Sequence, residues 1–274
     1  MRLNHNMFSM GIYSKYKDNI SQGKSSMEKI STGISINSAK DNPNKVASNE
    51  LLKIQILSNS AAKQNVQDTN SMLQTFDGSM QEIYNNLSRM KELTVNASTA
   101  SLEPEDRAVI QKEVDSIIRD IDYLANNTNF NGVTLLNDDK STVTSLIGGI
   151  AGQNLEIPKF DLRTDKLFSY SAGGMDVVHN PSAANEAVDR ALMKLTKATA
   201  IYGALETRLQ ETGDNIEKSN ETLQSAQSKI GDADIAKEML KYSQSQILVK
   251  SSTALMAQSN RMPQEALQIL SNIR

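Results

Sequence analysis

The stretch VQDTNSMLQTFDGSMQEIYNNLSRMKELTVNA, residues 66–97, decides the fold. Apolar and small side chains recur along it at alternating intervals of three and four residues. This period places them on one side of an α-helix and is typical of coiled-coil packing. The residues on this side are Val66, Thr69, Leu73, Phe76, Met80, Ile83, Leu87, Met90, Thr94 and Ala97. Leu52 and Ala62 extend the pattern toward the N-terminus, so we expect a helix over 45–99.

A second seam of the same period lies near the other end of the chain. It comprises Val188, Ala191, Leu195, Ala198, Tyr202, Leu205, Leu209, Thr212, Ile216, Ser219, Leu223, Ala226 and Ile230. Asn180 and Pro181 suit the cap and the first turn of this helix, which we expect over 181–230. Because an α-helix rises about 1.5 Å per residue, each long helix spans roughly 70 Å, too long for the interior of a compact globule. The sequence therefore predicts a mainly α, elongated antiparallel helical hairpin or coiled-coil bundle.

Two shorter segments separate these helices. Pro104 and the acidic residues after it predict a helix over 104–127, which ends at the turn-favouring stretch NNTNFNG. Residues 133–179 contain short β-favouring runs punctuated by Gly, Asn and Pro, so we expect a small β-hairpin region lying on the helices. The region is too small to be an independent catalytic domain.

The two ends of the chain carry further apolar patterns. The N-terminal pattern comprises Tyr13, Tyr16, Ile20, Gly23, Met27, Ile30 and Ile34, and ends before Asn42-Pro43-Asn44, which we expect to break the helix. The C-terminal pattern comprises Leu240, Tyr242, Ile247, Leu248, Val249, Leu255 and Met256. The second segment is apolar around much of its circumference, and a single partner helix cannot cover it. We therefore expect these residues to pack against other copies of the chain.

Composition excludes several kinds of chemistry. The chain has no cysteine and only two histidines, which leaves no thiol nucleophile, disulfide framework or histidine-based zinc site. The glycine cluster GGIAG, residues 148–152, lacks the Lys-Ser/Thr of a phosphate-binding loop and suits a hairpin turn better. A net charge of −3 argues against a nucleic-acid surface, and no window is apolar enough to span a membrane. We expect no enzyme and no cofactor.

Several blocks of this sequence resemble bacterial flagellins, in particular those of Gram-positive bacteria. The resemblance is carried, in collinear order, by MRLNHNM (1–7), KSSMEKISTGISIN (24–37), NVQDTNSMLQTFDGSMQEIYNNLSRMKELTVNAS (65–98), IDYLANNTNFNGVTLL (121–136), GDADIAKEMLKYSQSQILVKSSTALMAQSN (231–260) and PQEALQIL (263–270). The large variable part of many flagellins is reduced here to roughly residues 138–180. The chain therefore resembles a minimal flagellin without large outer domains.

The resemblance implies a structural subunit that polymerises into the flagellar filament for swimming motility. Residues 1–44 and 231–274 would then pair as the terminal helices of the inner filament tube, and residues 45–230 would form the outer tube. The implied location is the extracellular filament, reached by type III export without a cleaved signal peptide. The implied partners are other copies of the chain, the filament cap, the hook-associated junction proteins, and an export chaperone at the C-terminal helix.

The resemblance also implies recognition of the monomer by the host's Toll-like receptor 5. Carried over by motif, the contact residues are Arg89, Leu93 and Glu113. Arg89 and Leu93 lie four residues apart, so we expect them to share the polar face of their helix. Spacing alone favours reading Arg89 and Glu113 as ordinary solvated charges, and the family resemblance favours the receptor contact instead.

O-linked glycans are common on the exposed part of flagellins. The matching hydroxyl residues are Ser141, Thr142, Thr144 and Ser145, for which an unmodified polar loop is the alternative interpretation.

Two other functions remain open at this point. A hook–filament junction protein shares the terminal helices, although the blocks at 65–98 and 121–136 match flagellins more fully. A monomeric coiled-coil secretion or adhesion factor would not need a C-terminal helix that is apolar all round.

Overall fold

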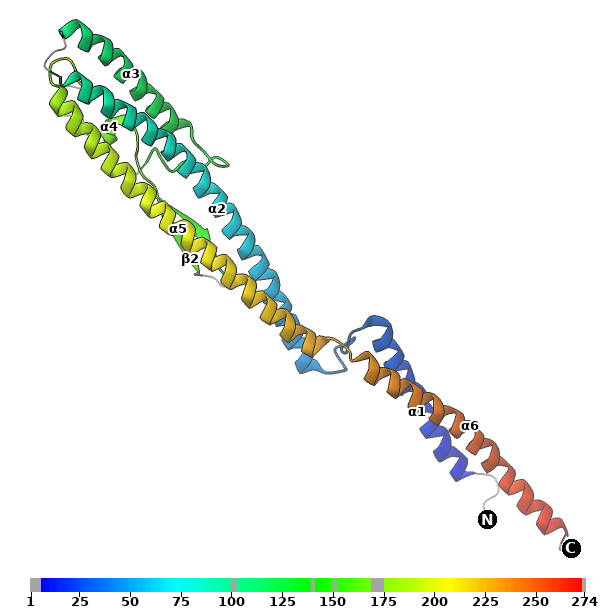
Figure 1. The fold of residues 1–274 in the computed structure, drawn as a ribbon. Coiled ribbons are helices and arrows are strands. Elements are labelled where there is room, and N and C mark those ends of the chain that lie inside the picture. The colour runs from blue at the N-terminus through cyan, green and yellow to red at the C-terminus, as the bar shows by residue number, and fades with distance from the viewer. Residues whose placement is uncertain (1–5, 100–102, 139–140, 150–151, 169–174, 273–274) are drawn as a thin grey trace. The chain divides into compact units, whose positions relative to one another are not determined.

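The computed structural model describes residues 6–99, 103–138, 141–149, 152–168 and 175–272 (Figure 1). The chain forms two compact units. Unit 1 consists of Met1–Gln55 and Thr222–Arg274, and unit 2 consists of Ile56–Glu221. Both divisions fall inside long helices, at residues 55/56 and 221/222.

The two longest helices are α2 (Pro43–Ala97) and α5 (Pro181–Gly231). Pro43 is the first residue of α2, and the Asn42 side chain accepts a hydrogen bond from the Lys45 amide (3.2 Å). Asn42-Pro43-Asn44 therefore lies where one helix has ended and the next begins, as predicted, and α2 starts at Pro43 because proline is tolerated at the first helical position.

The seam predicted on α2 is confirmed, since all ten of its residues from Val66 to Ala97 are buried. On α5 the predicted seam is buried from Val188 to Ala198 and again at Tyr202 and Leu209. Beyond Leu209 its residues are at most half-buried, and Ser219 is exposed. The core of unit 2 therefore lies in the part of the two helices that also carries α3 and the strands.

The shorter helix α3 (Pro104–Asn127) has the predicted bounds. It buries Val114, Ile117 and Ile121 in the same core as the α2 seam. After α3 the backbone reverses at Asn131 (φ 49°) and Gly132 (φ 82°), and Phe130 and Val133 exchange two hydrogen bonds of 2.9 Å. Positive φ at both central residues is the geometry that Asn-Gly favours, so the predicted turn is confirmed.

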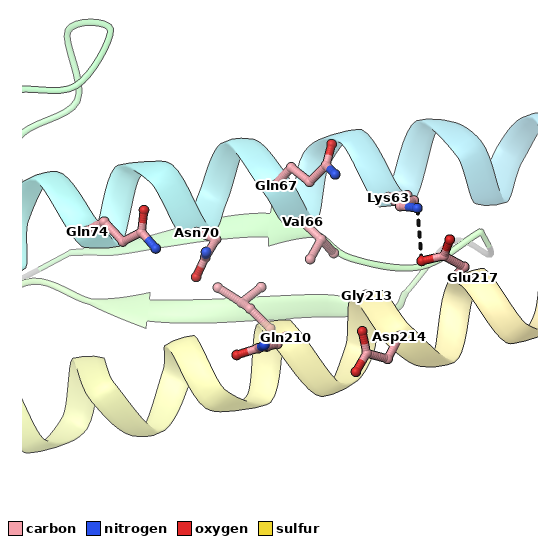
Figure 2. Close-up of a pocket in the computed structure, with 10 residues that line it drawn as sticks. Lys63, Val66, Gln67, Asn70, Gln74, Gln210, Gly213, Asp214 and Glu217 are labelled. Carbon is pink, nitrogen blue, oxygen red and sulfur yellow. Dashed lines mark ion pairs between the residues drawn. The ribbon is translucent and has the colours of Figure 1, made fainter.

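The predicted hairpin is the antiparallel pair of β1 (Thr142–Leu146) and β2 (Asn154–Pro158). Leu155 and Ile157 are buried while their neighbours Asn154 and Glu156 are exposed, so one face of the hairpin packs on the core. Figure 2 shows both strands running alongside α2 and α5. The glycine cluster connects the strands, and two of its residues, 150 and 151, lie outside the described residues.

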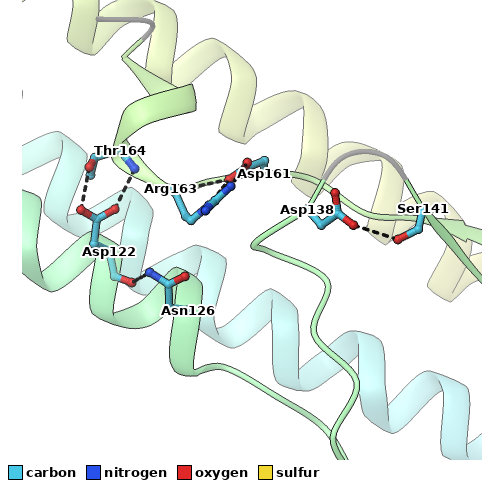
Figure 3. Close-up of polar contacts among 7 residues, drawn as sticks. All are labelled: Asp122, Asn126, Asp138, Ser141, Asp161, Arg163 and Thr164. Carbon is cyan, nitrogen blue, oxygen red and sulfur yellow. Dashed lines mark hydrogen bonds and ion pairs between the residues drawn. The ribbon is translucent and has the colours of Figure 1, made fainter.

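Two side chains of α3 fix the segments that follow the hairpin. The Asp122 carboxylate accepts hydrogen bonds from the Thr164 amide (2.8 Å) and hydroxyl (2.7 Å) at the start of the short helix α4 (Thr164–Leu167) (Figure 3). The Gln111 amide donates to the Met175 carbonyl and accepts from the Val177 amide, both at 2.8 Å. These contacts give hydrogen-bond partners to backbone groups that lack one within a helix or strand.

Unit 1 contains α1 (Met7–Thr32) and α6 (Ile235–Asn272), which pack side by side. Gly33, in the left-handed conformation (φ 71°), ends α1. Asp234 caps α6 by accepting from the Lys237 amide (3.1 Å). Two backbone hydrogen bonds link the residues just after α1 to the connection between α5 and α6. They run from the Ser35 amide to the Gly231 carbonyl (2.7 Å) and from the Ala233 amide to the Gly33 carbonyl (2.9 Å).

We expect Asp122→Ala to destabilise unit 2 by about 2 kcal/mol, because Thr164 is 2% exposed and its amide and hydroxyl would both lose their acceptor. Urea unfolding followed by circular dichroism measures the change. Asp120→Ala removes an exposed carboxylate from the same helix and should cost less than about 0.5 kcal/mol. Equal effects of the two variants would contradict the anchoring role of Asp122.

A carboxylate on α5 gives a prediction about pH. Oε1 of Glu206 is buried and accepts no hydrogen bond from the described residues. Burial and then the nearby carboxylate of Asp77 raise the pKa of Glu206 above its ordinary 4.5. A raised carboxyl pKa means that the folded state favours the protonated form. Ionisation of Glu206 therefore lowers the free energy of unfolding. This loss is absent below pH 4.5 and grows as the pH rises through the pKa of the folded state.

Glu206→Gln should therefore stabilise the protein at pH 7 by roughly 0.5 kcal/mol, since solvent screens the half-buried side chain, and the gain should vanish by about pH 4. Urea midpoints of the variant and the parent, measured across this range, test the expectation. Glu211→Gln, at an exposed position of the same helix, should show no such pH-dependent difference. A gain at pH 7 that persists unchanged at pH 4 would rule out Glu206 ionisation as its cause.

Candidate functional site

The fully buried positions in the contact between α1 and α6 are small or polar. They are Gly23 and Ser26 on α1, and Glu238, Ser245, Ser252 and Ser259 on α6. A Cβ placed on Gly23 would lie 3.4 Å from the Cβ of Ser245, so the two helices approach closely at this point. Serine and glycine bury little apolar area, so these central positions contribute little hydrophobic stabilisation to the pair.

Polar contacts supplement this seam at both ends. Asn6 Nδ2 donates to the carbonyl and hydroxyl oxygens of Ser259, both at 3.0 Å. Glu238 is 8% exposed and forms an ion pair with Lys241 (2.5 Å). Hydrogen bonds from Lys241 and then Ser26 hold the pKa of Glu238 below its ordinary value. A charged Glu238 is thus stabilised inside the seam.

The large apolar residues of the N-terminal pattern remain exposed although α6 packs beside α1. Tyr13, Ile20, Met27 and Ile34 recur every seven residues and are 54%, 45%, 51% and 44% exposed. They form an exposed row, ending at Ile34 just beyond α1, that we call the α1 stripe. Of the other residues of the predicted pattern, Gly23 is buried and Tyr16 and Ile30 are half-buried.

The same separation occurs on α6. Leu240, Ile247, Leu248 and Leu255 are 73%, 67%, 40% and 46% exposed, and we call them the α6 stripe. The other predicted residues, Tyr242, Val249 and Met256, are half-buried beside the seam. A groove of about 490 Å³ lies between the two helices, with Ile20, Met27, Tyr242 and Val249 among its lining residues. Each terminal helix therefore presents an apolar surface that its partner in the chain leaves uncovered.

The candidate receptor residues lie on α2 and α3, and they are not all exposed. Arg89 donates to Glu113 from Nε (3.0 Å) and Nη2 (2.9 Å), and its Nη1 pairs with Glu92 (3.0 Å). The side chains of Arg89 and Glu113 are 53% and 46% exposed. This ion pair bridges the two helices on the surface of unit 2.

Leu93 does not share this surface, contrary to the sequence-based expectation. It is 5% exposed and belongs to the hydrophobic core. Leu93 lies four residues from the exposed Arg89 and also four residues from Ala97, which is fully buried, so it sits between the exposed and the buried sides of α2. The four-residue step from Arg89 was misleading because it ignored this buried neighbour.

The candidate glycosylation residues divide in a similar way. Ser141, Thr142 and Thr144 are exposed, and the Ser141 hydroxyl donates to Asp138 (3.1 Å). Ser145 faces α2, where its hydroxyl lies 2.6 Å from that of Thr69. Three of the four hydroxyl groups are therefore at the surface.

A second groove, of about 410 Å³, lies between α2 and α5 (Figure 2). Its lining is mostly polar and includes Gln67, Asn70 and Gln210, with the Lys63–Glu217 ion pair (3.1 Å) at one end. Within the described ranges, no group of three or more His, Cys, Asp or Glu could hold a metal ion. The helices described here include none that is long and apolar enough to cross a membrane.

Both halves of the chain match models of a known protein family. Residues 3–141 match the bacterial flagellin N-terminal helical region, and residues 185–270 match the bacterial flagellin C-terminal helical region. The chain belongs to the bacterial flagellin family. It is therefore a structural, non-enzymatic subunit of the extracellular flagellar filament.

Full-length relatives agree with this assignment. The chain is 33% identical over 271 residues to a flagellin of Halalkalibacterium halodurans, covering 98% of this chain and 100% of the relative. It is 32% identical over 303 residues to a flagellin of Bacillus subtilis, and 32% identical over 290 residues to flagellin FlaB2 of Treponema pallidum, with the same two coverages. This full-length similarity to filament proteins favours flagellin over the junction-protein and monomeric-factor alternatives.

Solved structures support the fold. A crystal structure of Bacillus cereus flagellin is similar over 56% of this chain and 88% of its own, with a TM-score of 0.50 and 24% identity. A putative flagellar hook-associated protein of Vibrio parahaemolyticus is similar over 70% of this chain and 100% of its own, with a TM-score of 0.59 and 13% identity. Flagellins and hook-associated proteins thus share this helical architecture, and the fold alone does not separate them.

Sequence reasoning included Gly23 but missed the serines that are buried between α1 and α6. A usable signal was present, since Ser245, Ser252 and Ser259 recur every seven residues and Gly23 and Ser26 are three apart. Small polar residues at helical spacing were less conspicuous than the apolar rows beside them. The flagellin's terminal helices therefore bury small and polar residues between them and leave two apolar rows exposed.

Proposed function

We propose that the α1 and α6 stripes are the surfaces through which copies of this flagellin pack in the filament. The support is their exposure, which runs from 40% at Leu248 to 73% at Leu240 on helices whose mutual seam is largely serine and glycine. Rows of large apolar side chains lower the free energy most when neighbouring chains remove them from water. Heterologous contacts of this kind generate an open helical polymer when they do not close into a ring.

This proposal extends to the arrangement of the filament. Residues 1–44 and 231–274 would line its inner tube, and residues 45–230 would form the outer tube. Because the seam between α1 and α6 buries little apolar surface, the pair would gain most of its stability on assembly, through coupled folding and association. The α6 stripe would also be the surface offered to an export chaperone, and the terminal helices would contact the cap and the hook-associated junction proteins.

The stripes give a direct test by mutation. We expect Leu240→Asp with Ile247→Asp to reduce elongation from filament seeds by at least about tenfold, because burying two carboxylates in an apolar contact is costly. Electron microscopy and sedimentation measure the elongation. The thermal unfolding of unit 2 should not change, since both residues lie in unit 1.

Met193→Asp is the matched control, because Met193 is 64% exposed but lies on α5 in unit 2. This variant should elongate normally. Normal elongation by the Leu240/Ile247 double variant would refute the role of the α6 stripe.

We also propose that Toll-like receptor 5 recognises the monomer through Arg89 and Glu113. The support is the family resemblance of this segment together with the exposed ion pair that these residues form between α2 and α3. Leu93 would contribute by packing beneath them, since its side chain is buried.

Arg89→Asp should lower signalling in a receptor reporter-cell assay by at least about tenfold, because it reverses the charge that the receptor would contact. Arg190→Asp, at a residue with a comparably exposed side chain (54%) on α5, should leave the signal unchanged. Arg89→Glu combined with Glu113→Arg retains an ion pair between the same two positions with the charges exchanged. A signal that stays low in this variant would show that the receptor contacts the particular charge at each position. Full activity of Arg89→Asp would exclude this contact.

A further inference from the structure

Most of the described methionines of unit 1 are exposed, and most of those of unit 2 are buried. In unit 1, Met7, Met10, Met27, Met239 and Met262 are 77%, 61%, 51%, 48% and 60% exposed, and Met256 is half-buried. In unit 2, Met72, Met80, Met90 and Met175 are at most 7% exposed. Met193, at 64%, is the exception in unit 2 among the described residues. Solvent-borne reagents therefore reach the thioethers of the terminal helices and not those of the core.

The exposed thioethers are also the most readily oxidised groups in the chain, because it contains no cysteine. Hydrogen peroxide and hypochlorous acid are two-electron oxidants that attack thioethers. With peroxide, a sulfur lone pair takes one oxygen, the O–O bond breaks, and the departing hydroxide gains a proton to become water. The sulfur is oxidised by two electrons and the peroxide is reduced by two, which gives methionine sulfoxide.

Two of these methionines lie within the apolar rows of α1 and α6, where oxidation would change the polarity of the surface. Met27 belongs to the α1 stripe between Ile20 and Ile34, and Met262 follows Leu248 and Leu255 at the same seven-residue interval on α6. Sulfoxide formation turns a flexible apolar side chain into a polar one. A polar oxygen within a row of apolar side chains must be desolvated when a neighbouring chain covers that row.

We propose that the exposed methionines of α1 and α6 are an oxidation site that controls self-association. Peroxide or hypochlorous acid converts the unassembled chain into a form that does not add to a filament, while unit 2 stays folded. Enzymatic reduction of the sulfoxides restores assembly, because methionine sulfoxide reductases reverse the modification. In the assembled filament the stripes are covered, which protects the methionines within them. This inference rests on the proposed packing role of the stripes.

The test begins with peroxide treatment of the purified full-length monomer. Peptide mass spectrometry should find sulfoxide at Met7, Met10, Met27, Met193, Met239 and Met262, and little at Met72, Met80 and Met90. Circular dichroism should show unit 2 unfolding at its original temperature. Elongation from untreated seeds should fall at least about tenfold, and treatment with methionine sulfoxide reductases A and B should restore it. Normal elongation by a chain oxidised at the unit 1 positions would overturn the inference.

Two variants assign the effect to residues. Leucine is close to methionine in volume, so leucine replaces the thioethers at positions 7, 10, 27, 239, 256 and 262 in one variant and at 193 in the other. The readout is the ratio of elongation after peroxide to elongation before it within each variant. This ratio should be near one for the six-residue variant and as low as in the parent chain for Met193→Leu. Equal sensitivity of both variants would place the damage elsewhere and refute the proposal.

Further comparisons separate this inference from the packing proposal. Peroxide treatment of finished filaments should yield at least about fivefold less sulfoxide at Met27 and Met262 than treatment of the monomer, because neighbouring chains exclude the oxidant. If Leu240→Asp with Ile247→Asp blocks elongation but oxidation does not, the stripes assemble the filament and only the oxidative control is wrong. If that double variant elongates normally, the packing proposal itself fails.

Discussion

Unit 2 depends on the uninterrupted seam along α2. Its residues from Val66 to Ala97 are buried on one side of a single helix, and α3, α5 and the β hairpin all contribute side chains to the same core. The rest of unit 2 is positioned by contact with this row. Asp122, for example, can hold the start of α4 only because Val114, Ile117 and Ile121 first bury α3 in that core. The seam therefore sets where the surface charges of α2 and α3 meet.

Unit 1 differs from unit 2 in the kind of residue that it buries. Its two helices meet through Gly23, Ser26 and the serines of α6, which allow close approach but bury little apolar surface. The large apolar side chains lie on the outside instead. A two-helix unit with this distribution is suited to being completed by other chains, whereas unit 2 has an apolar core of its own.

The sequence predicted the helices of unit 2 well because their hydrophobic period is long and unbroken. The bounds of α3 and the Asn131-Gly132 turn were also predictable, since proline and Asn-Gly impose specific backbone geometry.

The sequence did not predict which side of α1 faces α6. A row of Tyr, Ile and Met lies one position away from the residues buried against α6, and this row gave a stronger apolar signal than Ser and Gly. Leu93 was misplaced for a related reason: spacing from one exposed residue does not determine burial on a helix that has neighbours on two sides. The anchoring roles of Gln111 and Asp122 depend on contacts between residues more than forty positions apart, which local patterns do not encode.

The contact between Asn6 and Ser259 joins residues that are 253 positions apart in the chain. Closing so long a loop has an entropic cost that must be met before the contact contributes any stability. Folding of Ile56–Glu221 into unit 2 replaces most of that loop with an ordered hairpin, which lowers the remaining cost of closure. We therefore expect α1 and α6 to pair after unit 2 has folded, which would make the surfaces most prone to stick to other chains the last to take their final shape.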